Sequence, residues 1–247
     1  MKKIISLMHQ AIKDYKMIKE GDKIAIGLSC GKDSLTLLKV LSMYQKHSIN
    51  KFEIIAITID IFGNTDYTKV EEFCKKINIE LVIIRTNINE KMLNKLQGKN
   101  PCSLCANLRR GHLYSKAKEL GCNKVALGHH ADDLIETFFM SMFKENRLNT
   151  FWPILYLSRQ ELYVIRPFVY VFENQITSSL TDELPIIKNS CLFDKKTYRE
   201  SIKNIITDLT IKVPEFKYHV LESLIQTNRY NLLDKSKLLS DSTNNSK

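Results

Sequence analysis

Hydrophobic residues follow two different periodicities along the 247-residue chain. Short apolar, β-branched runs of the kind found in strands buried on both faces occur at 23–28, 52–60, 81–85 and 124–128. Between and after these runs the apolar residues recur at helical spacing, at 34–46, 67–78, 104–119 and from Asp132 onward. This alternation predicts an α/β fold with a parallel sheet covered by helices on both faces.

The two ends of the chain have helical patterns of their own. Residues 3–17 form an amphipathic pattern that predicts an N-terminal helix. Beyond about residue 145 the pattern changes to an excursion with a last strand, and then to two helices over 198–211 and 216–233. We therefore expect a sheet of about five strands within a domain over 1–210, and a small helical extension with a frayed tail over 211–247.

The stretch GLSCGKDS, residues 27–34, joins the first predicted strand to the first predicted helix. Backbone N–H groups in such a loop, together with a helix N-terminus, form an anion site suited to phosphates. Gly31 permits close approach of the backbone, Lys32 supplies a positive charge, and Asp33 or Ser34 can position a metal or cap the helix. The spacing is not that of a Walker A loop. We expect residues 28–34, namely Leu28, Ser29, Cys30, Gly31, Lys32, Asp33 and Ser34, to bind a nucleotide.

Two further strand ends carry candidate ligands for this nucleotide. In GHHADD, residues 128–133, Gly128 and His129 can approach it, and Asp132 or Asp133 can hold Mg²⁺. The alternative for Asp132 is a simple helix N-cap. Asp60 ends another strand, where it either meets the ribose or adenine or merely terminates the strand. In open parallel sheets, ligands bind beyond the carboxyl ends of strands where the strand order reverses.

Six cysteines occur, at 30, 74, 102, 105, 122 and 191. Cys102 and Cys105 follow Pro101 at a predicted helix start, a place that lowers thiol pKa and favours metal binding or nucleophilic attack. Their spacing suits a metal site, with Cys191 as the natural third ligand. A zinc site would need a fourth ligand such as His112, His129 or His130. Burial is expected for Cys74 and Cys122.

Two quoted motifs resemble known families. LSCGKDS resembles the Ser-Gly-Gly-Lys-Asp-Ser loop of the PP-loop ATP pyrophosphatase superfamily. NPCSLCANLRRGHLYSKAKELGCNKVALGHHADDLIETFFMSMF, residues 100–143, resembles the tRNA 2-thiocytidine synthetase family, with its Cys-x-x-Cys-x-x-x-Arg-Arg-Gly and Gly-His-His-x-Asp-Asp motifs. The resemblance covers roughly residues 3 to 200. It implies a Rossmann-like PP-loop fold, cleavage of ATP to AMP and pyrophosphate with Mg²⁺, and sulfur transfer to a tRNA pyrimidine.

The same resemblance implies roles for individual residues. Lys32, Asp33 and Asp133 would act in catalysis, and a [4Fe–4S] cluster with one open iron would be held by Cys102, Cys105 and Cys191. Zinc at these cysteines, or a persulfide on Cys102 or Cys191, are the alternatives. Sulfur would come from a cysteine desulfurase or from sulfide, and a homodimer is possible.

Four features depart from the family pattern or have a second interpretation. Cys191 stands alone where the family shows a Pro-Cys-x-x-Cys-like context. Cys30 replaces a glycine, which either is tolerated or has a role in sulfur handling, and at a positive φ it would cost about 1 kcal/mol or more. Arg109 and Arg110 fall one turn beyond the cysteines, where they meet RNA phosphate or ATP, or simply cover a solvated helix face. We expect Trp152 to lie in the core rather than to stack on a base.

The net charge and the hydropathy of the chain limit the kinds of partner that it can have. The formal net charge is +10, and residues 1–150 carry 24 Lys and Arg against 16 Asp and Glu. This excess suits a polyanionic partner such as tRNA, although 29 lysines against 8 arginines also fit a lysine-rich background. No apolar run is long enough to span a membrane and no signal peptide is evident, so we expect a cytoplasmic location without membrane contact. Rival hypotheses are a lysidine synthetase, a sulfur transferase acting on another tRNA base or a small molecule, and a non-enzymatic regulator.

Overall fold

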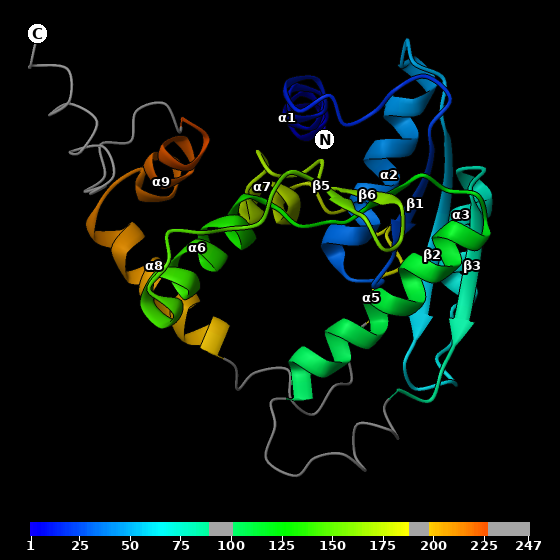
Figure 1. Cartoon of the computed structure of the whole chain (residues 1–247). Helices are drawn as coiled ribbons and strands as arrows, with labels where there is room; N and C mark the ends of the chain where they lie inside the picture. Colours follow the sequence, from blue (N-terminus) through cyan, green and yellow to red (C-terminus); the bar gives the residue numbers. More distant parts are fainter. Residues whose placement is uncertain (89–100, 188–197, 227–247) are drawn as a thin grey trace, which may run out of the picture. The chain divides into compact units, whose positions relative to one another are not determined.

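The structure is a computed structural model that describes residues 1–88, 101–187 and 198–226, with the backbone alone for Pro101 and Cys102. The strands are β1 (Lys23–Gly27), β2 (Glu53–Asp60), β3 (Glu80–Arg85), β4 (Lys124–Ala126), β5 (Ile154–Leu157) and β6 (Leu162–Ile165). The helices are α1 (Lys2–Asp14), α2 (Lys32–His47), α3 (Thr68–Lys76), α5 (Pro101–Glu119), α6 (Ala131–Glu145), α7 (Glu173–Ser178), α8 (Tyr198–Lys212) and α9 (Phe216–Ile225). Figure 1 shows these elements in sequence colours.

The sheet has the order β3-β2-β1-β4-β6-β5. The pairs β3–β2, β2–β1, β1–β4 and β4–β6 are parallel, and β5 pairs antiparallel with β6. The predicted α/β class is thus confirmed. The sheet is one strand larger than expected, because the excursion before the last parallel strand folds back as a hairpin. A short connection allows this antiparallel pairing, whereas parallel neighbours need a long crossover.

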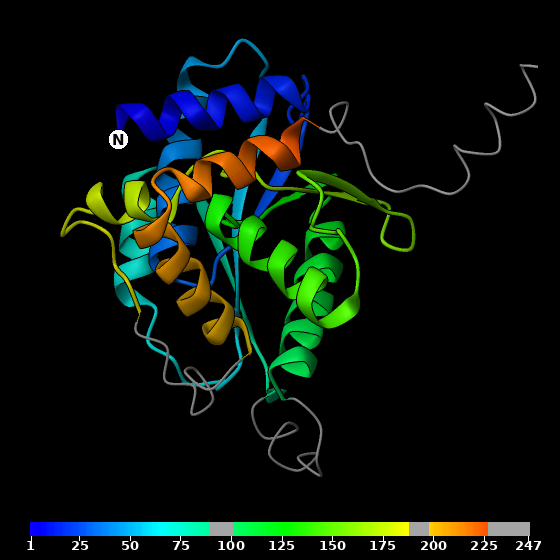
Figure 2. The same ribbon diagram turned by 90° about the vertical axis from the view of Figure 1, so that its left-hand side faces the viewer.

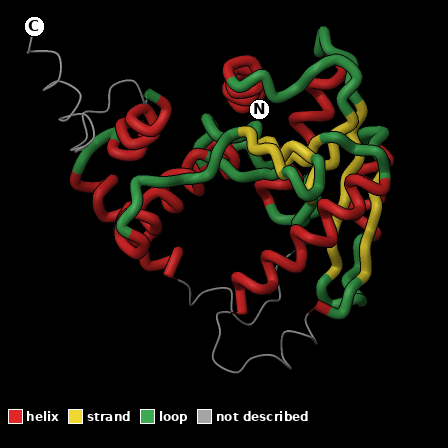
Figure 3. Tube along the Cα trace, viewed as in Figure 1, coloured by secondary structure: helices red, strands yellow, loops and turns green. Residues whose placement is uncertain are grey.

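The direction of strand addition reverses at β1. The chain moves outward from β1 through β2 to β3 and then returns to the other side of β1 at β4. Right-handed crossovers place α2 and α3 on one face of the sheet, where they contact β1 and β3, and α5 on the other, where it contacts β2 and β4. Figure 3 shows the strands flanked by helices. A crevice is expected beyond the carboxyl ends of β1 and β4, where the two halves diverge.

The helix α2 is buried on nearly all sides over its first ten residues. It contacts β1 on one side and α1 and α7 on others, and Figure 2 shows α1 crossing near it. A helix with buried residues on several sides needs such cover from several elements. The N-terminus of α2, which begins directly after the GLSCGKDS loop, is therefore held firmly at the carboxyl end of the sheet.

The chain divides into two compact units, residues 1–204 and 205–247. The sheet and all the candidate site residues belong to the first unit. The second predicted terminal helix corresponds to α9, and its residues beyond 226 lie outside the described part. No helix in the described ranges is both long and apolar enough to cross a membrane.

Candidate functional site

The loop between β1 and α2 presents backbone donors at the carboxyl end of the sheet. Gly31 is the N-cap of α2, and among the described residues no side chain caps this helix end. The Gly31 N–H donates to the Ser29 hydroxyl at 3.4 Å, and the Ser34 hydroxyl donates to the Gly31 carbonyl at 3.1 Å. The two hydroxyls are themselves 3.1 Å apart. The first-turn N–H groups of α2 therefore remain for an anion at the positive end of the helix dipole.

Cys30 has a φ of +60°, so it occupies the left-handed region that glycine tolerates best. The strain anticipated for a positive φ, about 1 kcal/mol or more, therefore applies. Its sulfur is buried 3.8 Å from the Thr58 hydroxyl, and its carbonyl accepts a hydrogen bond from the Ile187 N–H at 3.0 Å. Burial raises the pKa of this thiol to about 11, outweighing the opposing effect of the Thr58 hydrogen bond. Cys30 is thus a buried thiol whose raised pKa favours the protonated form.

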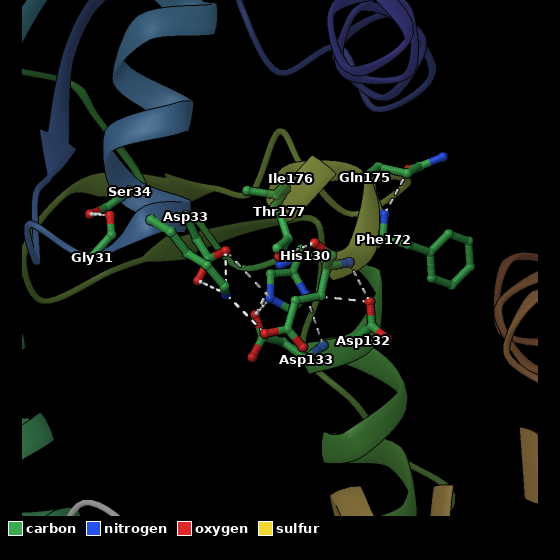
Figure 4. Close-up of polar contacts among 12 residues, drawn as sticks. Gly31, Asp33, Ser34, His130, Asp132, Asp133, Phe172, Gln175, Ile176 and Thr177 are labelled. Carbon is green, nitrogen blue, oxygen red and sulfur yellow. Dashed lines mark hydrogen bonds and ion pairs between the residues drawn. The ribbon is translucent and has the colours of Figure 1, made fainter. Parts of the chain in front are cut away.

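A capping box organises the start of α6. His130 Nδ1 accepts a hydrogen bond from the Asp133 N–H at 3.4 Å, and the His130 N–H donates to Asp133 Oδ2 at 3.0 Å. The other ring nitrogen of His130, Nε2, lies 3.5 Å from Asp133 Oδ2 and 3.9 Å from Asp33 Oδ1. Figure 4 shows the carboxylates of Asp33 and Asp133, from the first turns of two helices, converging on His130.

Gly128 allows β4 to end against the backbone of α2. An added Cβ would lie 3.1 Å from both the Asp33 carbonyl carbon and the Ser34 nitrogen. The close approach expected of this glycine is therefore required by the protein's own helix. The next residue, His129, accepts a hydrogen bond at Nδ1 from Arg166 Nε at 3.4 Å. Burial lowers the pKa of His129 to about 4 despite the nearby Asp133, so the imidazole is neutral at neutral pH.

A cavity of about 360 Å³ lies where the strand order reverses. Its volume is in the range of small-molecule sites. The residues that line it and were predicted from the sequence to belong to the site are Leu28, Ser29, Asp33, Ser34, Arg109, Arg110, Gly128, His129 and Asp133. Its remaining wall is mainly apolar and consists of Gly27, Ile57, Ile59, Ala106, Leu113 and Leu127. The structure thus gathers most of the predicted site around one space that offers an apolar wall, two arginines and two carboxylates.

A second cavity of about 150 Å³ shares Ser29, Ile59 and Arg109 with the first. Cys30, Gly31 and Asp60 also line it. The buried Asp60 carboxylate accepts hydrogen bonds from the N–H groups of residues 62, 63 and 65 and from Arg85 Nη1 at 3.1 Å. Both carboxylate oxygens are engaged, so Asp60 shapes the loop that forms one wall of this space.

Lys32 and Asp132 line neither cavity and meet Glu173 instead. Asp132 Oδ2 accepts a hydrogen bond from the Glu173 N–H at 2.6 Å. The Glu173 carboxylate lies 2.9 Å from the ammonium groups of both Lys32 and Lys203. Burial opposes its ionisation, but hydrogen bonds from the two lysines lower the pKa of Glu173 to about 2. Lys32 also contacts the carboxylate of Asp33 at 2.9 Å, so the loop lysine is held between two carboxylates.

Arg199, at the start of α8, reaches back to α6. Its Nη1 donates to Asp133 Oδ1 at 2.9 Å and lies 3.4 Å from Glu136 Oε2. Burial raises the pKa of Glu136 to about 7, against the opposing effect of Arg199. Asp133 is thus oriented by a cation on one side and by the His130 capping box on the other.

The cysteine pair lies on α5, the helix that also supplies Arg109 and Arg110 to the cavity. Cys105 is half-buried and packs against the apolar core, and the adjacent Ala106 lines the cavity. Cys102 is one turn earlier, with only its backbone described, and Cys191 lies outside the described residues. Among the side chains that are described, no group of three or more His, Cys, Asp and Glu is arranged to hold a metal ion.

Several contacts of this site were not anticipated. Glu173, Arg199 and Lys203 are distant in sequence from the motifs that they contact, and no local pattern marks them. The His130–Asp133 capping box has a recognisable three-residue spacing that an N-cap search could have found. The expectation that Trp152 lies in the core is wrong, because its side chain is 69% exposed.

Comparisons with known proteins agree with this geometry. A family model described as a PP-loop domain matches residues 2–209. The chain is 37% identical over 232 residues to the tRNA-cytidine(32) 2-sulfurtransferase of Pseudomonas paraeruginosa, covering 91% of this chain and 84% of that protein. The protein of the same name from Dichelobacter nodosus is 37% identical over 237 residues, covering 94% and 89%.

A solved structure provides a match of the fold. The U34-tRNA thiolase NcsA from Methanococcus maripaludis, determined with its [4Fe–4S] cluster, has a TM-score of 0.73 and 24% identity, covering 95% of this chain and 82% of that one. The family resemblance inferred from the motifs is confirmed by the matches over most of the chain. The chain belongs to the tRNA-cytidine(32) 2-sulfurtransferase family of PP-loop proteins.

Proposed function

We propose that this protein uses ATP to replace the C2 oxygen of a tRNA cytidine with sulfur. The observation that carries the proposal is the cavity at the strand reversal. The phosphate-binding loop borders it on one side, and α5, which carries Cys102 and Cys105, borders it on another. Family membership supplies the reaction type, and the cavity gathers residues that suit ATP beside the helix that carries Cys102 and Cys105.

The donor set of the cavity fits ATP. The uncapped N-terminus of α2 and the cationic side chains of Arg109 and Arg110 suit the phosphates. The apolar wall suits the adenine. Asp33 and Asp133 offer carboxylate oxygens to Mg²⁺, which prefers such ligands together with substrate phosphates. Lys32 is paired with Asp33 and Glu173. Because it belongs to the phosphate-binding loop, it is close enough to neutralise charge on the departing pyrophosphate.

The chemistry is an activation followed by a substitution. The C2 oxygen of the pyrimidine attacks the α-phosphorus of ATP, and pyrophosphate leaves with the electron pair of the broken P–O bond. Sulfur at the oxidation level of sulfide then attacks C2, and AMP leaves with the former C2 oxygen. No net oxidation or reduction is required. Activation matters because a carbonyl oxygen is a poor leaving group, and AMP is a much better one.

The cysteines on α5 fit a sulfur-handling role. Cys102 and Cys105 lie one helical turn apart, and Ile187, four residues before Cys191, is bonded to the nucleotide loop at Cys30. We assign Cys102, Cys105 and Cys191 as ligands of a [4Fe–4S] cluster. When bound, this cluster would hold the sulfur that is transferred.

Anaerobic purification with metal analysis, followed by a thiolation assay, tests the proposal. With ATP, Mg²⁺, sulfide and unmodified tRNA, we expect 2-thiocytidine by mass spectrometry and equal amounts of AMP and pyrophosphate. About four irons per chain are expected, with broad visible absorption that Cys105→Ala removes. The matched control Cys122→Ala alters a buried thiol before the amino end of β4 and should keep both iron and activity. One zinc without colour would contradict the cluster, and AMP formation without any thiolated nucleoside would contradict the substrate.

A further inference from the structure

The connection from α6 to β5, residues 146–153, exposes an unusual side chain. Trp152, the only tryptophan of the chain, is 69% exposed. Leu148 in the same connection is 58% exposed. Two large apolar side chains left in solvent within one short connection suggest that a partner covers them. Trp152 is therefore a candidate contact for a partner.

The backbone at Trp152 is tied to the catalytic cavity. Arg166, buried in the first unit, donates from Nη1 to the Trp152 carbonyl at 2.6 Å and from its backbone N–H to the Pro153 carbonyl at 2.9 Å. The same guanidinium donates from Nε to His129, which lines the cavity. The ring of Phe151 lies 5.3 Å from that of His129 and 4.8 Å from the Arg166 guanidinium. The backbone of Trp152 is thus joined through one side chain, that of Arg166, to His129 in the cavity wall.

The charge around Trp152 suits a polyanion. The connection over 146–153 contains Arg147 and no Asp or Glu. Arg147 is exposed and forms no ion pair with another described residue. Exposed aromatic and cationic side chains without carboxylates are the combination that binds single-stranded RNA, by stacking on bases and neutralising phosphates.

We infer that Trp152 is the platform on which an unstacked nucleotide of the RNA substrate stacks at the mouth of the cavity. This inference rests on the proposed function, because a base that reacts inside the cavity must first leave its stack. An exposed aromatic ring on a segment tied to the cavity wall offers a replacement stacking surface for that base or its neighbour. Arg166 acts as a positioning residue, since it joins the Trp152 carbonyl to His129.

The single tryptophan makes the contact directly observable. Intrinsic fluorescence of the full-length protein should be quenched by an RNA hairpin whose loop contains unpaired cytidines. A fully paired RNA duplex of equal length should leave it nearly unchanged. Equal quenching by both RNAs, or none by the hairpin, would overturn the inference. Fluorescence that changes with protein concentration alone would assign the surface to a second copy and overturn it as well.

Substitutions separate stacking from folding and from the reaction itself. Trp152→Ala should raise the Kd for the hairpin about 5- to 150-fold, the range measured for loss of one base–aromatic stack, and Trp152→Phe should restore most of the affinity. ATP affinity should not change in either variant. The matched control Tyr156→Ala removes a half-exposed aromatic from the hairpin that follows Trp152, where its ring packs on Tyr163 at the amino end of the sheet, and should bind RNA normally.

The outcomes also separate this inference from the proposed function. Normal hairpin affinity and normal KM for tRNA in Trp152→Ala, in an enzyme that thiolates tRNA, would refute the stacking role alone. Quenching by the hairpin and weakened binding by Trp152→Ala, in a protein that makes no 2-thiocytidine, would support the RNA contact and reject only the proposed reaction.

Discussion

Replacing Gly128 by alanine tests how the end of β4 positions the nucleotide loop. The new Cβ would lie 3.1 Å from the Asp33 carbonyl carbon, 3.1 Å from the Ser34 nitrogen and 3.2 Å from the Asp33 carbonyl oxygen. All three are backbone atoms of the first turn of α2, so no side-chain rotation relieves the contact. Because ordinary contacts begin near 3.4 Å, the turn must retreat by a few tenths of an ångström.

Two quantities should respond to this displacement. Overpacking of this kind costs about 1–3 kcal/mol of unfolding free energy. The displaced turn carries the N–H groups proposed to bind phosphate, so ATP affinity should fall roughly tenfold, the equivalent of about 1.4 kcal/mol for weakened hydrogen bonds to a charged group. Urea unfolding followed by circular dichroism measures the first quantity, and isothermal titration of ATP measures the second.

Gly111 provides the matched control. It lies within α5 and an added Cβ there meets nothing within 4 Å. Gly111→Ala should therefore stabilise the protein by about 0.5–1 kcal/mol through helix propensity. A Gly128→Ala protein with the unfolding midpoint and ATP affinity of the wild type would refute the claim that this glycine sets the position of α2.

Three further predictions concern titration and reactivity. The pKa of Glu173, lowered from 4.5 to about 2, means that its ion pairs stabilise the fold above pH 4.5 and are lost as the pH falls toward 2. Glu173→Gln should thus lower the free energy of unfolding by about 1–2 kcal/mol at pH 7, allowing for solvent screening of a carboxylate whose side chain is 26% exposed. Urea unfolding should show the stabilities of wild type and variant converging as the pH falls from 4.5 to 2. The pKa of His129 is lowered from 6.5 to about 4, so between these pH values the unfolded chain binds a proton that the folded chain does not. The stability of the wild type should therefore fall as the pH drops from 6.5 to 4, and His129→Gln should lack this component. An imidazole NMR titration centred near 6.5 would contradict the prediction. The buried thiol of Cys30, with its pKa near 11, should resist iodoacetamide in the native protein and react only on unfolding, as peptide mass spectrometry can show.

Local patterns were sufficient to predict the strands and loops that carry the candidate site. Apolar, β-branched runs predicted β1 to β4, since a strand buried on both faces must be apolar at nearly every position. The loop at 27–34 and the stretch at 128–133 indicated a phosphate site because backbone donors at strand ends can be recognised from glycines and helix starts. Ser29, Gly31, Asp33, Gly128 and Asp133 indeed meet at the two cavities, where the strand order reverses.

Contacts between distant segments were decided by the tertiary structure alone. Glu173 pairs with Lys32, and Arg199 pairs with Asp133. Both pairs join segments that are far apart in the sequence, and no sequence periodicity predicts such contacts. The fold also exposed Trp152, because the excursion before β6 formed an edge hairpin instead of filling the core. Propensity and hydrophobic pattern describe a residue's neighbours along the chain. The partner of a charge, or the cover over an aromatic ring, depends on which elements the completed sheet brings together.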